Sequence, residues 1–448
     1  MALINYSSLL GNVLLPMHNG VQGRSYCRNL KFLEKSQWWN EQRLREFQWG
    51  ELRKLLEVTF GSSPYYQRKY KEAGAELGDI RTHEDFAKLP VLGREEIQQH
   101  RDEMKAAAYK GKLVPHATGG SSGVPTRFLL TMESFDWRTA ATQRAYAWPG
   151  CRLGEPTLYL WGAPIGKQSW KQQTKMDLFR MIRREYMFPT FNQTPELWQE
   201  IYEYARRKRP PFVVGYVSSI EQFCRYLIDR KLELGGIRAV ISAAEAVHDH
   251  HRELVAEALG GVPLYNMYGS REFMSIAGEC DRRDGLHIHC ENLLIETARP
   301  ASEGPSEILV TDLHNHGMPF IRYKIGDVGV LESTPCGCGR GLPRISRIEG
   351  RVLDMLRTSD GRYVPGEFFP HLLKDIPEVV EFQVEQKALD RIVVSVVLSK
   401  PMGEASRKLL ESEVERVFGR GTRVEIAPVE SIPLRASGKR RVTIGLEG

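Results

Sequence analysis

The stretch Thr118-Gly119-Gly120-Ser121-Ser122-Gly123-Val124-Pro125-Thr126 is the part of the sequence from which the fold is best argued. Its three glycines let the backbone adopt positive φ angles and approach a ligand closely. Exposed N–H groups, together with the Thr118, Ser121 and Ser122 hydroxyls, would then cradle phosphoryl oxygens. A polar Gly/Ser run is also common in ordinary surface loops, so its meaning depends on the rest of the chain.

The residues after this loop predict a strand over 127–131, which gives a strand–loop–strand arrangement. A P-loop NTPase has strand–loop–helix instead. The run Gly162 to Lys167 resembles a Walker loop in part, but it lacks one spacer residue and the following Ser or Thr. The sequence therefore disfavours a P-loop NTPase.

Apolar strand-like runs alternate with amphipathic helices over the next hundred residues. This alternation predicts α/β layers with a largely parallel sheet. Between 286 and 331, short β-rich runs predict a more antiparallel or barrel-like subdomain, and a boundary is expected near 347–351. The expected strands are 157–161, 212–215, 239–242 and, after the boundary, 391–398; the expected helices are 43–59, 195–207, 219–230 and 249–259.

Composition limits the function classes. The chain has 448 residues, 42% of them hydrophobic and 26% charged, which is typical of a globular protein with two or more domains. No stretch reaches the roughly 20 apolar residues that cross a bilayer. The N-terminal 17 residues lack the positive region of a signal peptide, and seven cysteines show no regular framework, so we expect a cytoplasmic protein with reduced thiols. The basic run 206–209 is interpreted as a helix C-terminus and not as a nucleic-acid patch.

Four further motifs follow the glycine-rich loop in order. They are Tyr268-Gly269-Ser270-Arg271-Glu272, Tyr323-Lys324-Ile325-Gly326-Asp327, Glu349-Gly350-Arg351 and Ser437-Gly438-Lys439. From about Gln48 to the C-terminus, the chain resembles the adenylate-forming (acyl-CoA ligase) superfamily. The match is best to its phenylacetate–CoA ligase-like branch, which includes proteins of capsule and exopolysaccharide loci. The resemblance implies a nucleotide- and acid-binding domain over 1–347, and a small, mobile α+β lid domain over 348–448 that carries a catalytic lysine.

The resemblance also implies the residues that bind the nucleotide. The Thr118–Gly123 loop would hold the β- and γ-phosphates. Tyr268 would stack on adenine, Asn266 would read the edge of the base, and Glu272 would hold Mg²⁺. Glu245 either lies in the adenine-contacting turn or is a helix N-terminal acid. The full predicted set is Thr118, Gly119, Gly120, Ser121, Ser122, Gly123, Glu245, Asn266, Tyr268, Gly269, Asp327 and Arg351 for the nucleotide, with Lys439 and Glu272 as catalytic residues.

Three of these residues have further implied roles. The carboxylate of Asp327 would accept both ribose hydroxyls, and Arg351 would open the hinge to the lid domain. The ammonium of Lys439 would bridge the substrate carboxylate and the α-phosphate. The chain departs from the family at Val124, where a lysine is usual, and at Leu353, where the family has Asp or Lys.

The implied reaction is ATP-dependent activation of a small-molecule carboxylic acid as an acyl-adenylate, with release of pyrophosphate. The acyl group would then pass to a thiol, with CoA as the expected acceptor. The departures at Leu353 and at turn 359–362 leave open an amide-forming ligase without CoA. Those at Val124 and Leu353 leave open a non-catalytic nucleotide-binding relative. We expect no nucleic-acid partner, and a homodimer is compatible with the sequence.

A cysteine–histidine group suggests a metal site. Cys280, His287, Cys336 and Cys338 supply three thiolates and an imidazole, which suit tetrahedral Zn²⁺. His289 is an alternative ligand because it lies on the same strand face as His287. The competing interpretation is a set of reduced cysteines packed in a Gly-rich turn. We interpret the neighbouring His248, His250 and His251 as surface residues.

Overall fold

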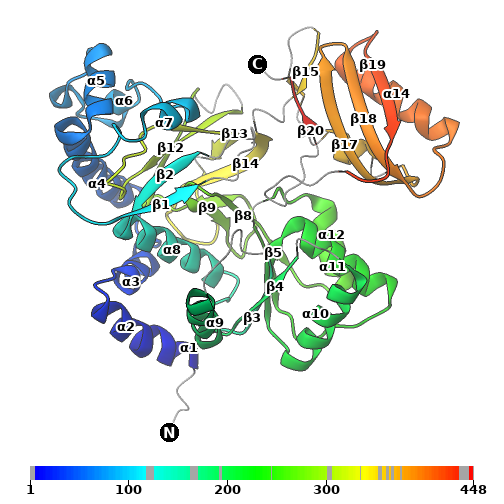
Figure 1. Cartoon of the computed structure of the whole chain (residues 1–448), viewed down its shortest axis with the longest axis horizontal. Helices are drawn as coiled ribbons and strands as arrows, with labels where there is room; N and C mark the ends of the chain where they lie inside the picture. Colours follow the sequence, from blue (N-terminus) through cyan, green and yellow to red (C-terminus); the bar gives the residue numbers. More distant parts are fainter. Residues whose placement is uncertain are drawn as a thin grey trace. The chain divides into compact units, whose positions relative to one another are not determined.

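The computed structural model describes residues 6–117, 126–161, 170–190, 194–243, 245–299, 305–332, 334–351, 356–359, 363–364, 368–373, 376–432 and 443–446 (Figure 1). The chain has an α/β fold divided into two compact units. The first comprises Met1–Glu296, Leu309–Tyr323 and Leu331–Ser346, and the second comprises Thr297–Ile308, Lys324–Val330 and Arg347–Gly448.

A five-stranded parallel sheet forms part of the first unit. Its order is β4-β3-β5-β6-β7, and its strands are β3 (Thr157–Trp161), β4 (Glu185–Pro189), β5 (Phe212–Tyr216), β6 (Ala239–Ala243) and β7 (Leu264–Tyr265). The alternation in the sequence predicts β3, β5 and β6 to within one residue. The crossover helices are α10 (Pro195–Lys208), α11 (Val217–Asp229) and α12 (Asp249–Ala258), and all three coincide with predicted helices.

This sheet is buried on both faces, as parallel sheets usually are. Val213 and Val240 pack into one cluster with the helices α10 to α12. Their neighbours Val214 and Ile241 point the other way and pack with Ala145 of α8 (Met132–Ala147). Because both faces are covered, the carboxyl ends of the strands are the edge left for polar functional groups.

A second sheet of seven strands has the order β11-β12-β13-β14-β10-β9-β8. Its pairs β8–β9, β9–β10 and β10–β14 are antiparallel, and of these strands only β10 lies in the 286–331 segment for which antiparallel strands are predicted. The strands are β8 (Met267–Ser270), β9 (Met274–Glu279), β10 (Leu286–Ile288), β11 (Leu293–Thr297), β12 (Ser306–Asp312), β13 (Tyr323–Glu332) and β14 (Arg344–Arg351).

Helices form most of the N-terminal part of the first unit. They are α1 (Tyr6–Leu9), a π-helical turn (Leu10–Leu14), α2 (Leu15–Val21), α3 (Tyr26–Ser36), α4 (Glu41–Ser62), α5 (Pro64–Glu72), a 3₁₀ turn (Leu77–Asp79), α6 (His83–Phe86) and α7 (Arg94–His100). The hairpin of β1 (Leu113–Ala117) and β2 (Arg127–Thr131) follows, then α8, and α9 (Trp170–Arg183) comes after β3. Helix α4 contains the predicted 43–59 segment and begins at the N-cap Asn40, whose side chain accepts from the N–H of Arg43.

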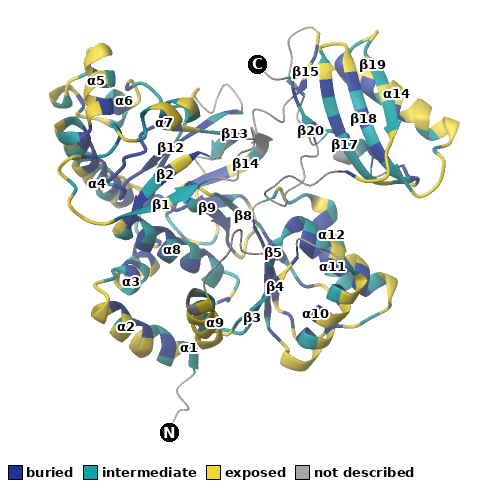
Figure 2. Cartoon of the chain, viewed as in Figure 1, coloured by how far each residue is buried: buried dark blue, intermediate teal, exposed yellow. Residues whose placement is uncertain are grey.

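Two fully buried ion pairs join α8 to the β-rich part of the first unit. Arg138 pairs with Asp312, and Arg144 pairs with Glu291 at 2.6 Å. Arg144 also lies 3.1 Å from Nδ1 of His289. Buried charges are tolerated only when they are paired in this way, so loss of one partner should be strongly destabilising. Figure 2 shows α8 as largely buried.

The second unit has its own hydrophobic core. Its four-stranded sheet has the order β19-β18-β17-β20, with an antiparallel β17–β18 pair and parallel β18–β19 and β17–β20 pairs. The elements after residue 355 are β15 (Leu356–Arg357), β16 (Tyr363–Val364), α13 (Phe368–Leu373), β17 (Val379–Ala388), β18 (Arg391–Leu398), α14 (Glu404–Phe418), β19 (Arg423–Pro428) and β20 (Thr443–Ile444). This α+β arrangement agrees with the expected fold class.

Candidate nucleotide site and metal centre

The hairpin β1–β2 frames the glycine-rich loop. Ala117 and Arg127 are paired across the hairpin, so the chain leaves and re-enters it at adjacent positions. Residues 118–125, which include the predicted phosphate-binding Thr118–Gly123, lie outside the described residues. At the loop exit, Arg94 Nε donates to Oγ1 of the buried Thr126 at 2.6 Å. Both ends of the loop are therefore held in place.

Arg271, in the motif Tyr268–Glu272, lies at the entry of this loop. Its Nε and Nη2 each lie 3.4 Å from the carbonyl oxygen of Ala117, the last residue before the loop. The side chain is exposed, so its positive charge faces solvent at the loop entry. The sequence pattern alone did not single out this residue, since the resemblance assigns roles only to its neighbours.

Asn266 lies where β6 and β7 end. Its Oδ1 accepts a hydrogen bond from Oγ of Ser242 at 3.4 Å, which joins the two segments predicted to contact adenine. The Asn266 N–H donates to Oε2 of Glu279 at 2.8 Å. Arg252 pairs with Glu279 at 2.7 Å. Burial raises the pKa of Glu279, and Arg252 opposes that shift. This supporting pair has no motif of its own in the sequence.

Gly269 lies at an irregularity between β8 and β9, directly after Tyr268. A Cβ built on Gly269 would overlap the carbonyl oxygen of Met274, so only glycine fits this approach. The register shift changes the direction of β8 between Tyr268 and Gly269. The half-buried Tyr268 side chain is therefore held next to a rigid backbone position.

Glu272 links the motif Tyr268–Glu272 to the motif Tyr323–Asp327. Its side chain is only 8% exposed, and Oε1 accepts a hydrogen bond from the Tyr323 hydroxyl at 3.3 Å. Its backbone oxygen accepts from the buried Arg138 guanidinium. Tyr323 begins β13, and Asp327, 7% exposed, lies four positions along the same strand. Two motifs about fifty residues apart thus meet through a direct side-chain contact.

Glu245 contacts the N-terminus of α11. Its Oε2 accepts from the Ser218 N–H at 2.7 Å, and Oε1 accepts from the Ser218 hydroxyl at 3.1 Å. A carboxylate at this position is favoured by the helix dipole. This contact agrees with the helix-terminal interpretation of Glu245, although the helix is α11 and not the one that follows it in sequence.

The two remaining predicted residues belong to the second unit. Arg351 is the last residue of β14. Lys439 lies in 433–442, outside the part of the chain that the structure describes.

The four predicted metal ligands gather in one place. The ligand atoms of Cys280, His287, Cys336 and Cys338 all lie within 4.8 Å of one another. Cys280 Sγ is 3.8 Å from Cys336 Sγ, and Cys338 Sγ is 3.3 Å from Nε2 of His287. The other nitrogen of His287, Nδ1, lies 3.3 Å from the carbonyl oxygen of Leu342. That contact fixes the tautomer in which Nε2 is free to bind a metal.

Two backbone N–H groups also point at the sulfurs. Arg282 N–H donates to Cys280 Sγ at 3.4 Å, and Arg340 N–H donates to Cys338 Sγ at 3.5 Å. Such N–H···S contacts favour thiolates. Three thiolates and one correctly oriented imidazole are the donor set of a closed tetrahedral zinc site, so the residues present fit the ion.

The prediction of His289 as an alternative ligand is wrong. Its Nε2 is 2.9 Å from Oγ of Ser275, and its Nδ1 faces Arg144. Both ring nitrogens therefore have partners inside the core. Strand β10 ends at Ile288, so the alternation that would place His287 and His289 on one face does not continue.

The three neighbouring histidines do not form a metal group among the described residues. The prediction that they lie on the surface holds only in part, because His251 is buried and its Nδ1 accepts from the His248 N–H at 3.0 Å. His251 therefore caps α12.

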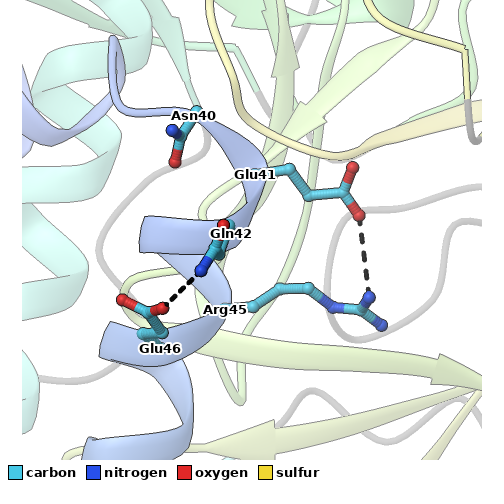
Figure 3. Close-up of a pocket in the computed structure, with 5 residues that line it drawn as sticks. All are labelled: Asn40, Glu41, Gln42, Arg45 and Glu46. Atoms are coloured by element: carbon cyan, nitrogen blue, oxygen red, sulfur yellow. Dashed lines mark hydrogen bonds and ion pairs between the residues drawn. The ribbon is translucent and has the colours of Figure 1, made fainter.

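A surface hollow lies at the start of α4 (Figure 3). Its volume is about 580 Å³, and its lining is Asn40, Glu41, Gln42, Arg45 and Glu46. The polar groups bond to one another: Gln42 donates to Glu46 at 2.9 Å, and Arg45 lies 3.8 Å from Glu41. None of the residues predicted to bind nucleotide lines this hollow, so it is separate from the candidate site.

Comparison with known proteins gives consistent relatives. A family profile described as the CapK C-terminal domain matches residues 356–445. The phenylacetate-coenzyme A ligase of Thermus thermophilus is 28% identical over 397 residues, covering 83% of this chain and 86% of that protein. Protein CapK of Staphylococcus aureus is 24% identical over 413 residues, covering 90% of each.

The fold has solved counterparts. A 2-hydroxyisobutyryl-CoA ligase, crystallised in the postadenylation state with an acyl-AMP, superposes with a TM-score of 0.68 at 20% identity, covering 88% of each chain. At this identity the likeness concerns the fold. The profile match and the relatives above agree with the resemblance that the ordered motifs indicate. The chain is similar over most of its length to phenylacetate-coenzyme A ligases and to CapK, and its residues 356–445 match the CapK C-terminal domain.

Proposed function

We propose that the protein is an AMP-forming acid ligase. An oxygen of the substrate carboxylate attacks the α-phosphorus of ATP, the bond to pyrophosphate breaks, and an acyl-adenylate forms. The observation that carries the proposal is the hydrogen bond between Tyr323 and Glu272, because it joins two of the nucleotide motifs. The Ser242–Asn266 contact supports it independently. The named relatives include phenylacetate-coenzyme A ligases.

Each of the predicted nucleotide-site residues has its own role in this reaction. The buried Glu272 carboxylate would hold Mg²⁺, which takes one or two protein carboxylates and would neutralise phosphate charge. Asp327 holds the ribose, Tyr268 and Asn266 hold the adenine, and Glu245 positions the turn that follows β6. Positioning of this kind lowers the barrier by removing the entropy cost of bringing acid and α-phosphate together.

Lys439 supplies positive charge where negative charge develops between the carboxylate and the α-phosphate. It belongs to the C-terminal segment that matches the CapK profile. We propose that residues 348–448 act as a lid domain that delivers this lysine to the nucleotide, with Arg351 at the hinge.

Arg271 replaces the cation that the loop itself lacks. The usual lysine position holds Val124, whereas the Arg271 guanidinium lies at the entry of the loop. A guanidinium can pair with two phosphate oxygens at once. Arg271→Gln should therefore raise the KM for ATP more than it lowers kcat.

The acceptor is a thiol, and CoA fits the named relatives best. An amine acceptor remains the alternative, motivated by Leu353. Hydroxylamine traps an acyl-adenylate without CoA as the hydroxamate. CoA-dependent release of AMP, followed as thioester formation with phenylacetic acid and a panel of other acids, identifies the thiol reaction. Amide formation without any effect of CoA would identify the amine reaction instead.

We also propose that Cys280, His287, Cys336 and Cys338 bind one structural zinc ion. Zinc would tie Cys280 after β9 and His287 in β10 to the segment before β14, which supplies Cys336 and Cys338. The purified protein should contain about one zinc per chain, measured by mass spectrometry of metals. Cys336→Ser/Cys338→Ser should lose it, whereas Cys27→Ser, a partly buried cysteine elsewhere, should keep it. A folded wild-type protein that contains no more zinc than Cys336→Ser/Cys338→Ser would contradict this assignment.

A further inference from the structure

Helix α9 contains both apolar and charged residues, and none of its described residues is buried. Its large apolar side chains are strongly exposed: Trp170 at 73%, Met181 at 67% and Leu178 at 53%. A helix with this many apolar residues normally packs them against the rest of the molecule. Leu178 and Met181 instead stay more than half exposed, which marks α9 as a candidate contact surface.

The turns from Leu10 to Val21 carry a second exposed apolar stripe. Leu14, Met17 and Val21 recur at intervals of three and four residues and therefore share one helix face. Val21 is 90% exposed and Met17 is 67% exposed. Residues 6–21 contain no Lys, Arg, Asp or Glu, so no charge interrupts this face.

The N-terminal helices and the end of α9 are in contact. The Tyr6 hydroxyl, at the start of α1, donates to the carbonyl oxygen of Ile182 near the end of α9 at 2.6 Å. The Arg184 guanidinium lies 4.3 Å from the centre of the Tyr6 ring. Figure 1 shows α1, α2 and α9 as neighbours, and Figure 2 shows exposed residues on both α2 and α9. We call the exposed residues of these helices the N-terminal face.

Positive charge is concentrated around this face. Residues 1–36 hold four Lys or Arg and one Glu, and residues 170–184 hold five Lys or Arg and one Asp. The whole chain carries a net charge of +6, so the remainder is close to neutral. Three of these cations are committed to ion pairs, Arg24 with Asp136, Arg180 with Asp177 and Arg183 with Glu185. Others are exposed: Arg28, Lys31, Lys35, Lys175 and Arg184.

We propose that the N-terminal face docks on an anionic lipid bilayer. Short helices with exposed Trp, Leu and Met side chains, flanked by Lys and Arg, are suited to lie at the boundary between headgroups and acyl chains. Each cation near an anionic surface adds to the attraction, and in these two segments only Glu34 and Asp177 oppose it. A protein partner would not require this one-sided charge. The acid ligase would then work at the membrane surface without crossing it.

No helix in the described part of the chain has the length and apolar character of a membrane span. The proposed contact is therefore peripheral, and it does not depend on the adenylation chemistry. Attachment should weaken as salt screens the exposed cations, because the Debye length is about 10 Å at 0.1 M salt.

The test is flotation of the purified full chain with vesicles. We expect binding to vesicles of phosphatidylcholine mixed with phosphatidylglycerol, weaker binding to phosphatidylcholine alone, and release by high salt. Leu178→Glu/Met181→Glu and Met17→Glu/Val21→Glu should each reduce binding by about tenfold or more, because they place charge in the apolar contact. Val380→Glu, a matched control at a 62% exposed site in the second unit, should bind as wild type does.

Three results would overturn the proposal. The first is a wild type that floats with neither kind of vesicle, and the second is a Val380→Glu variant that loses as much binding as the test variants. The third is a wild-type dimer in light scattering that Leu178→Glu/Met181→Glu converts to monomer without any vesicle binding, which would make the face a contact between copies. Unchanged melting temperatures and unchanged pyrophosphate release in solution would show that the variants are folded, and would separate this test from that of the ligase function.

Discussion

The contact between Tyr323 and Glu272 makes the first prediction at the scale of single residues. Tyr323→Phe keeps the ring in its buried position and removes only the hydroxyl that donates to Oε1 of Glu272. The carboxylate then loses one constraint on its orientation toward Mg²⁺. We expect acid-dependent pyrophosphate release to fall about fivefold, the size of one ordinary hydrogen bond, and the Mg²⁺ concentration for half-maximal rate to rise.

Tyr226→Phe provides the matched control. Its hydroxyl donates to Gln199, within the helices α10 and α11. Kinetic assays at several Mg²⁺ concentrations should show no change in this variant. An equal loss of rate in both variants would mean that Tyr323 acts through general stability and not through Glu272.

Glu221 makes the second prediction, on acid stability. Burial raises its pKa, but Arg225 at 2.8 Å and His251 at 3.7 Å outweigh burial, and the pKa falls from 4.5 to about 2. Folding lowers the pKa of this carboxyl, so the carboxylate stabilises the folded protein at any pH above the pKa it has in the unfolded chain. This stabilisation is lost as the pH falls toward the pKa of the folded state. The contribution, on the order of 2 kcal/mol, should therefore disappear between about pH 5 and pH 2.

Urea unfolding at a series of pH values measures this contribution. Glu221→Gln should be less stable than wild type at neutral pH, and the difference should shrink as the pH approaches 2. Glu203→Gln, at a more exposed acid that pairs with Arg206, should show little difference at any pH. A Glu221→Gln deficit that is the same at pH 3 and pH 7 would contradict the assignment.

At the scale of elements, the β8–β9 pair depends on Gly269. A methyl group at this position would meet the Met274 carbonyl, so Gly269→Ala should shift the two strands apart. We expect a loss of stability of about 1–3 kcal/mol, together with a raised KM for ATP because Tyr268 moves. Thermal unfolding and ATP titration measure the two effects.

Gly260→Ala is the control for backbone strain alone. Gly260, unlike Gly269, has a positive φ, and a Cβ there would meet nothing within 4 Å. This variant should lose some stability and keep its affinity for ATP. If Gly269→Ala kept wild-type affinity for ATP, the bulge would not position the nucleotide site.

The elements also show what the sequence can and cannot predict. Strands β3, β5, β6 and β18 were predictable because each is a short apolar or β-branched run between clear breaks. Helix α9 and strand β4 were not predicted, because α9 leaves its apolar residues exposed and β4 is a polar-ended edge strand. Periodicity arguments assume that apolar residues are buried, and α9 departs from that assumption.

The candidate site also has parts that the sequence predicts and parts that it does not. The four metal ligands could be predicted from residue types, and they do lie together. Other features depend on contacts between segments that are distant in the sequence. They are the position of Arg271 beside Ala117, the Glu279–Arg252 pair and the two polar partners of the His289 ring. Such contacts have no local signal in one sequence. The roles of Lys439 and of the Thr118–Gly123 loop stay predictions from resemblance.

At the scale of the whole molecule, the central claim is that the chain adenylates an acid. The most direct measurement is acid-dependent release of pyrophosphate from ATP and Mg²⁺, with wild type and Lys439→Ala assayed side by side over aliphatic, aromatic and amino acids. We predict release with at least one acid, and a decrease of about 100-fold or more in Lys439→Ala while ATP still binds. ATP binding by the wild type without release for any acid, or release that Lys439→Ala leaves unchanged, would contradict the account.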